Sequence, residues 1–204
     1  MAKTMTASGP KTITNGQNEN VADKLRATMR KHRSEVASDM AQKVLGVENL
    51  GMELYAVVRK HAERFSNMLS RIVAVDRSRS PQAALDATGR RQYTDRAVVD
   101  AMPRGDGTEV EIFFFKPGCF LSDADLEKEF DLRGLKPADP YSLAAVNEKD
   151  PAFADAHPNA THWKDAAGRW CFATFYRWRD GRLVGVDRGD HDWHDRWWFA
   201  GVRK

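Results

Sequence analysis

The residues best suited to chemistry lie in a short acidic stretch near the carboxyl terminus. Residues 187–195 read DRGDHDWHD, with two histidines and four aspartates. Imidazole nitrogens and carboxylate oxygens are the ligands that zinc and other divalent ions take in proteins. The candidate ligands, including two histidines from an earlier loop, are His157, His162, Asp190, His191 and His194. Their spacing matches no established metal motif, so a solvated loop is the alternative interpretation.

Other catalytic patterns are absent from the sequence. It contains no G-x-S-x-G, no P-loop, no G-x-G-x-x-G and no C-x-x-C. Cys171 and His162 are a conceivable thiol–histidine pair, but Cys171 falls inside a predicted strand, where a buried thiol is unreactive. The sequence therefore predicts no catalytic residue and no cofactor, and a metal-dependent hydrolase is kept only as an alternative.

Aromatic residues at the carboxyl end predict the element that would position this loop. All six tryptophans lie between residues 163 and 198. Three strands are predicted, at 169–178, 182–188 and 196–203, with a tight turn at residues 179–181. In the first strand, Trp170, Phe172, Thr174, Tyr176 and Trp178 alternate with Cys171, Ala173, Phe175 and Arg177. Both faces of this antiparallel sheet therefore need a cover. A predicted helix at 123–132 covers one face. A partner, the long loop 135–168, in which residues 141–146 could form a short helix, or the N-terminal helices cover the other.

Large aromatic side chains on such a sheet are also common anchors of protein interfaces. The candidate protein-binding residues are Tyr176, Trp178, Trp193 and Trp198. Ordinary packing in the core is the alternative reading of each of them.

The front half of the chain is basic and periodic. Residues 1–106 hold 18 Lys/Arg and 12 Asp/Glu. Apolar residues recur at helical spacing from Val21 to Val44 and again from Leu54 to Val75, the second run with an average step of 3.5 residues. This predicts an antiparallel helical hairpin, although the second seam could pair with another chain. The cations that could bind nucleic acid are Arg26, Arg30, Lys31, Arg33, Arg59, Lys60 and Arg64.

Four segments follow from these patterns. They are a disordered tail (1–20), a helical hairpin (21–76), a linker of short helices (77–107) and a C-terminal α+β domain (108–204) with a strand at 109–116. The 204 residues are 42% apolar and 30% charged, as in soluble globular proteins. No apolar run approaches membrane-spanning length and no secretory signal is seen, so we expect a cytoplasmic protein without a membrane partner.

The chain resembles a group of small, uncharacterised bacterial proteins in three stretches: RSPQAALDATGRRQYTDR, DLEKEFDLRGLKPADPYSLAAVNEKDPAFAD and the final WWFAGVRK. That group carries no assigned activity, cofactor or catalytic residue. The resemblance therefore implies only a bacterial cytosolic setting.

The sequence as a whole predicts an α+β protein, in which an N-terminal helical hairpin precedes a small antiparallel sheet domain with one packed helix. The preferred function is a non-catalytic binding or interaction protein that contacts a protein partner or itself. Nucleic-acid binding through the basic helices is the main alternative.

Overall fold

The computed structural model describes residues 13–66, 68–190 and 192–204. Contacts divide the chain into two compact units, Met1–Val57 and Val58–Lys204, each of which is described by itself. Most of the predicted disordered tail, residues 1–12, lies outside the described residues. The domain limits predicted at residues 20, 76 and 107 remain predictions.

The amino-terminal segment is helical. Its helices are α1 (Asn15–Lys31), α2 (Ser38–Leu45) and α3 (Leu50–Ser66). Helix α1 begins before the predicted residue 21 because Thr14 and Gln17 form a capping box. The structure does not confirm the predicted hairpin, since neither α1 nor α2 contains a buried residue.

The predicted continuation of the second helix to residue 75 is wrong. Residues Met68–Ala74 form strand β1, which pairs along its whole length with β3 (Glu109–Phe115). The β-branched residues Ile72 and Val73 suit a strand, and the long-range pairing overrides the helical spacing. The strand expected at 109–116 is confirmed.

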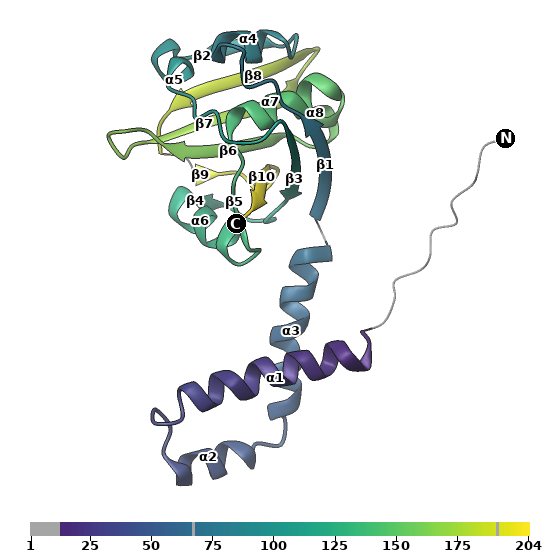
Figure 1. Cartoon of the computed structure of the whole chain (residues 1–204), viewed down its shortest axis with the longest axis vertical. Coiled ribbons are helices and arrows are strands. Elements are labelled where there is room, and N and C mark those ends of the chain that lie inside the picture. Colours follow the sequence, from purple (N-terminus) through teal and green to yellow (C-terminus); the bar gives the residue numbers. More distant parts are fainter. Residues whose placement is uncertain (1–12, 67, 191) are drawn as a thin grey trace, which may run out of the picture. The chain divides into compact units, whose positions relative to one another are not determined.

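One large mixed sheet organises the second unit (Figure 1). Its other strands are β2 (Arg91–Thr94), β5 (Leu135–Pro137), β6 (Asn159–Lys164), β7 (Trp170–Trp178), β8 (Gly181–Arg188) and β10 (Trp198–Arg203). The order is β1-β3-β10-β6-β7-β8-β2, with β5 beside β10. Strands β4 (Leu121–Ser122) and β9 (Asp192–Trp193) form a separate short ladder.

The α+β class is confirmed, but the expected antiparallel sheet is too simple. Strand β10 runs parallel to β6, and β2 runs parallel to β8. All three C-terminal strands exist near the predicted positions, yet β6 and β7 separate β10 from β8. Strands β7 and β8 do pair as neighbours, but β10 does not lie next to β8, and the alternation of side chains alone could not reveal this.

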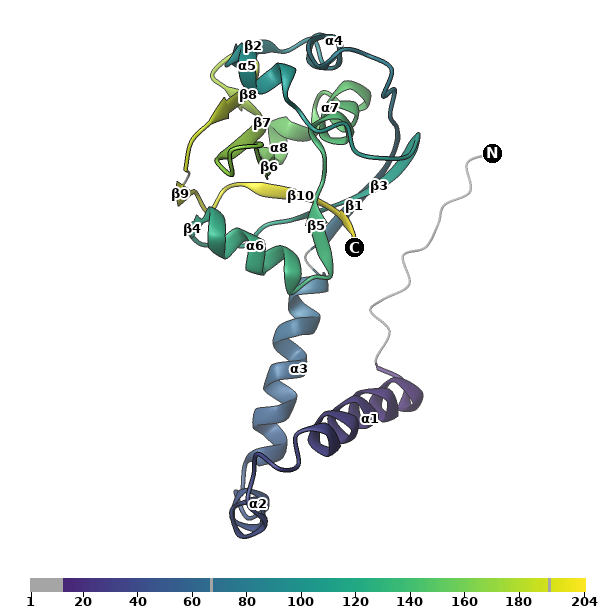
Figure 2. The same ribbon diagram turned by 60° about the vertical axis from the view of Figure 1, so that its left-hand side comes forward.

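The helices of this unit cover both faces of the sheet. They are α4 (Pro81–Asp86), α5 (Arg96–Asp100), α6 (Asp123–Asp131), α7 (Pro140–Lys149) and α8 (Phe153–Ala156). Helix α6 lies beside β4 and β5, away from α4 and α5 (Figures 1 and 2). Side chains cap the start of three of these helices: Ser80 caps α4, Asp95 caps α5 and Ser122 caps α6.

The predicted long loop at 135–168 is wrong, except that the short helix considered at 141–146 lies within α7. The stretch contains β5, α7, α8 and β6. Helix α7 is buried from Pro140 to Asn147, so it has no polar face and gives no amphipathic signal. Its Pro140 occupies the first turn, where proline is tolerated, and Asp139 caps it.

Two hydrophobic clusters fill the two faces, and they confirm the predicted alternation in β7. Cys171, Ala173, Phe175 and Ala200 belong to the cluster that includes α7. Phe172, Tyr176, Trp197 and Phe199 belong to the cluster that includes Leu126 and Phe130 of α6. The predicted helix therefore does cover one face, and the misassigned loop region covers the other.

Candidate functional site

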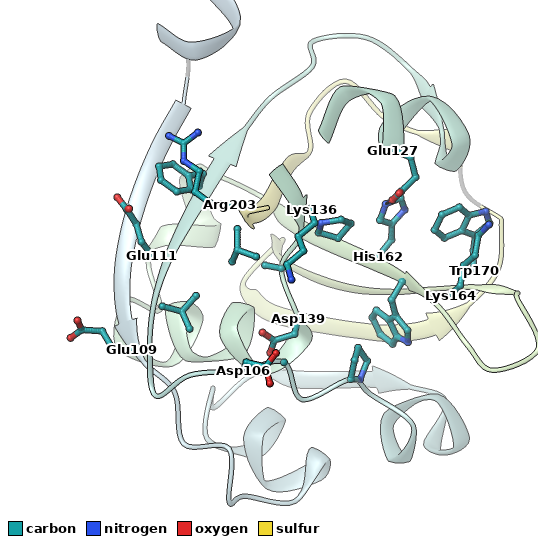
Figure 3. Close-up of a pocket in the computed structure, with 18 residues that line it drawn as sticks. Asp106, Glu109, Glu111, Glu127, Lys136, Asp139, His162, Lys164, Trp170 and Arg203 are labelled. Atoms are coloured by element: carbon teal, nitrogen blue, oxygen red, sulfur yellow. Dashed lines mark ion pairs between the residues drawn. The ribbon is translucent and has the colours of Figure 1, made fainter. Parts of the chain in front are cut away.

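A groove opens where two parallel strands separate. Strands β6 and β10 pair only over Asn159–Ala160 and Trp198–Phe199. The following residues of β10 pair with β5 instead. The end of β6 is thereby left beside a groove of about 780 Å³ (Figure 3). Its walls come from β3, α6, β5, β6, β10 and the loop around residues 103–106. A crevice between diverging strands is a common place for a ligand.

A buried histidine forms one side of this groove. His162 has no exposed side-chain surface, and its Nδ1 lies 2.9 Å from Oδ1 of Asp123. Trp193 Nε1 donates to the same oxygen at 2.8 Å. Asp123 is itself buried at the first turn of α6, where the helix dipole stabilises a negative charge. Two donors and a helix terminus therefore hold this carboxylate in place.

A second carboxylate meets the other nitrogen of the ring. Glu127, one turn further along α6, places Oε1 2.7 Å from His162 Nε2. The contact is close but not aligned as a hydrogen bond, and Nε2 has no other hydrogen-bond partner among the described residues. Because a neutral imidazole carries only one N–H, carboxylates on both nitrogens favour the imidazolium form. Burial lowers the pKa of His162, but the hydrogen bond with Asp123, the close contact with Glu127 and the negative charge of both carboxylates raise it more, so the net pKa lies above its ordinary value.

Aromatic rings fix the orientation of this imidazole. Trp170 stacks on His162 with 4.6 Å between ring centroids and 9° between planes. Phe130 lies 5.8 Å away at 29°. The ammonium of Lys164 sits over the Trp170 ring, 4.6 Å from its centroid. We call Asp123, His162 and Glu127 the carboxylate–imidazole cluster.

Charged residues of both signs line the groove. Its carboxylates are Asp106, Glu109, Glu111, Glu127 and Asp139, and its cations other than His162 are Lys136, Lys164 and Arg203. Asp139 is neutralised by Arg77 at 2.9 Å, and Arg203 lies over the ring of Phe113. Asp106, Glu109 and Glu111 then equal Lys136, Lys164 and Arg203 in number, so the net negative charge of the groove comes from the carboxylate–imidazole cluster, beside walls that include Trp163 and Trp170.

A different surface stands out in the helical segment. The apolar residues Val21, Leu25 and Met29 of α1 are 41%, 44% and 56% exposed. They recur every four residues and so lie along one side of the helix. The apolar residues of α2 and α3 that are also exposed include Met40, Val44, Met52, Leu54 and Val57. We call these residues together the apolar helix stripe.

The candidate protein-binding aromatics do not form one surface. Trp193 is 2% exposed and belongs to the core beneath α6. Tyr176 and Trp198 are partly buried against opposite clusters. Trp178, at the β7–β8 turn, is 55% exposed. Only Trp178 offers most of its surface to a partner, and the role of all four as contacts stays a prediction.

The candidate nucleic-acid ligands are exposed but mixed with acids. Arg26 pairs with Asp23 at 2.7 Å, and Glu19 lies 3.9 Å away. Arg30, Lys31, Arg33 and Arg59 are exposed, whereas the side chains of Lys60 and Arg64 lie outside the described residues. Residues 13–57 hold six cations (Lys24, Arg26, Arg30, Lys31, Arg33, Lys43) and six acids (Glu19, Asp23, Glu35, Asp39, Glu48, Glu53). This segment therefore has no net charge.

The candidate metal ligands are dispersed. His157 stacks on Phe153 and meets the edge of Trp198, and His162 belongs to the carboxylate–imidazole cluster. Asp190 and His194 are exposed, and His191 lies outside the described residues. Across residues 13–66, 68–190 and 192–204, no three His, Cys, Asp or Glu side chains are grouped so as to hold a metal ion. The metal-dependent alternative stays a prediction without added support.

Sequence reasoning missed Asp123 and Glu127. The available signal was two acids one turn apart on a predicted helix, but such pairs usually face solvent.

Within the described residues, no helix has the length and apolarity needed to cross a membrane.

Comparison of the chain with protein-family models, with curated proteins and with solved structures gives no match.

Proposed function

We propose that the chain is a non-catalytic interaction protein that associates through the apolar helix stripe with a protein partner, either a second copy of itself or another protein. One observation carries the proposal. Helices α1 and α2 keep an apolar spacing typical of a packed face, yet neither contains a buried residue. Such a face normally has a cover.

Energetics support this reading. Helices of eight to seventeen residues are marginal in water on their own, and most of their stability comes from packing of the apolar face. Full burial of one large apolar side chain contributes about 1.5–3 kcal/mol. Several such side chains lie on α1, α2 and α3, so a partner that covered them would gain substantial binding energy. Several exposed apolar side chains on neighbouring elements typically mark an interaction site.

Charge favours a protein over a nucleic acid as the partner. Binding to a phosphate backbone draws its affinity from neutralising cations. In residues 13–57 the cations equal the acids, and Arg26 is already paired within its helix. A surface with interspersed charges of both signs around an apolar stripe suits another protein surface instead.

Light scattering and affinity capture with the full chain test the proposal. We expect a solution mass above the 23.1 kDa of one chain, or retention of a specific protein by the immobilised chain. A double substitution, Leu25→Asp with Met29→Asp, should abolish either result because it places charge on the stripe. Ala27→Asp, on the opposite side of α1, is the matched control. A monomeric chain that retains no protein, or equal effects of the two variants, would contradict the proposal.

A further inference from the structure

We propose that the groove beside the carboxylate–imidazole cluster binds an organic cation, namely an ammonium or guanidinium group. The site is separate from the apolar helix stripe and does not depend on its role. The proposal rests on three observations: the charge of the buried cluster, the contact already made by Lys164, and the unpaired acids along the opposite wall.

The buried cluster presents a negative charge to the groove. Two carboxylates flank one imidazole, so the cluster carries a net charge of about −1 even when His162 is protonated. Asp123 lies behind the ring and is 4% exposed, whereas Glu127 is 45% exposed and lines the groove. The excess charge is therefore accessible at Glu127.

The position of Lys164 shows that a positively charged group can occupy this part of the groove. Its ammonium lies 4.6 Å from the centroid of Trp170, whose ring stacks on His162. An aromatic face beside carboxylates is a favourable place for a cation. Lys164 is exposed and its side chain is long, so a ligand could displace its ammonium without disturbing the core. Lys164 thus acts as a resident cation in the place where the ligand's cation would bind.

Acids on the opposite wall extend the site. Asp106, Glu109 and Glu111 are exposed, and their carboxylates have no ion-pair partner in the described part of the chain. Figure 3 shows Glu109 and Glu111 on the side of the groove opposite Glu127 and Trp170, with their carboxylates directed away from those two residues. A ligand with two or more separated positive charges would therefore meet Glu127 on one side of the groove and Asp106 of the 103–106 loop on another. A polyamine and an extended peptide with Arg or Lys side chains both have this character.

Calorimetric titration of the full chain with tryptophan fluorescence as a second readout tests the proposal. The probes are spermidine, acetyl-arginine methylamide and its neutral isostere acetyl-citrulline methylamide. We expect saturable binding of at least one cation and at least about tenfold weaker binding of the citrulline compound, because only the charged group satisfies the carboxylates. Tighter binding of spermidine would identify a free amine as the source of the cation, and tighter binding of the arginine compound would identify a protein side chain.

Three variants locate the binding. Glu127→Gln should weaken cation binding at least about tenfold, since it removes the negative charge at the groove while keeping the shape of the side chain. Lys164→Met should tighten it about threefold, because the resident cation no longer competes for Trp170. Asp100→Asn, which removes the same charge from the exposed Arg96–Asp100 pair outside the groove, should change it less than about twofold. Lys164→Met keeps the test valid if Glu127→Gln fails to fold.

The opposite results would overturn the proposal. These are no saturable binding of either cation to the unaltered chain, equal weakening by Glu127→Gln and Asp100→Asn, or unchanged or weaker binding by Lys164→Met.

Discussion

The helical segment and the sheet unit use the same sequence pattern with opposite outcomes. Leu126 and Phe130 of α6, four residues apart, are 0% and 1% exposed. Val21 and Leu25 of α1, also four residues apart, are 41% and 44% exposed. Apolar spacing therefore predicts a helix and its apolar face, but it does not say whether other residues of the same chain pack against that face. The difference separates residues that stabilise this fold from residues available to a partner.

The largest expected effect comes from truncating one large apolar side chain in each region and comparing the losses of stability. Phe114 is fully buried between β1 and β10 and packs edge-on against Phe153 at 4.8 Å. Phe114→Ala should lower the free energy of unfolding by about 3–5 kcal/mol, because it loses contacts and leaves a cavity. Leu25→Ala should leave the unfolding of the sheet unit almost unchanged. Urea denaturation followed by tryptophan fluorescence, which reports on the sheet unit, measures both. Equal losses would mean that the two regions are not energetically distinct.

A polar contact of the sheet unit gives the next largest effect. The Arg77 guanidinium donates to Asp139, to Ser142 Oγ and to the carbonyls of Asp106 and Gly107. Both charged side chains are mostly buried, at 15% and 13% exposure. Arg77→Met should cost about 3 kcal/mol, since it leaves Asp139 buried without its counterion.

The double variant Arg77→Met with Asp139→Asn provides the check on that interpretation. It should recover part of the loss, because the unpaired charge is gone. A double variant that is less stable than Arg77→Met would contradict the ion-pair explanation. Thermal and urea unfolding of the three proteins measure the comparison.

Much of the local structure near the site was predictable, and its reasons are local. Ser122 as a cap, helix α6 and the alternation in β7 all follow from short-range rules of capping and spacing. Strand β6 was not predicted, because Pro158 precedes it and its residues lack alternation: four consecutive positions, Asn159 to His162, are buried. A strand buried on both faces gives no period-two signal.

The carboxylate–imidazole cluster could not be predicted, for a different reason. Asp123 and His162 are 39 positions apart, and their contact depends on β6 lying beneath α6. That placement follows from the parallel pairing of β6 with β10, which is a long-range choice. Long-range pairing also explains why β1 was predicted wrongly. Its apolar residues have helical spacing, but pairing with β3 makes the segment a strand.

The protonation of His162 provides a smaller, pH-dependent test within the sheet unit. The charged groups that face the ring are Asp123 and Glu127 from α6, with Lys164 nearby over Trp170. Because the net pKa of His162 is raised, the native state holds this proton more tightly than the unfolded state does. The stabilisation is complete below the unfolded pKa of about 6.5 and is lost as pH rises through the native pKa. The slope is at most about 1.4 kcal/mol per pH unit.

Denaturation at several pH values above 6.5 measures this effect. His162→Gln should remove the decline, whereas His157→Gln should keep it, because His157 lies outside the cluster. Parallel stability curves for the unaltered chain and His162→Gln would refute the assignment of the proton to this residue.

The smallest expected effect concerns an ion pair of the helical segment. It joins the same residue types as Arg77–Asp139, but it is exposed to solvent. Arg26 and Asp23 are 2.7 Å apart, but their side chains are 59% and 67% exposed. Water screens both charges, so Arg26→Ala should change the free energy of unfolding by less than about 0.5 kcal/mol. The measurement is helix content by circular dichroism during urea titration. A loss comparable to that of Arg77→Met would show that Arg26 is covered in solution, and would place a partner over this side of α1 as well as over the apolar helix stripe.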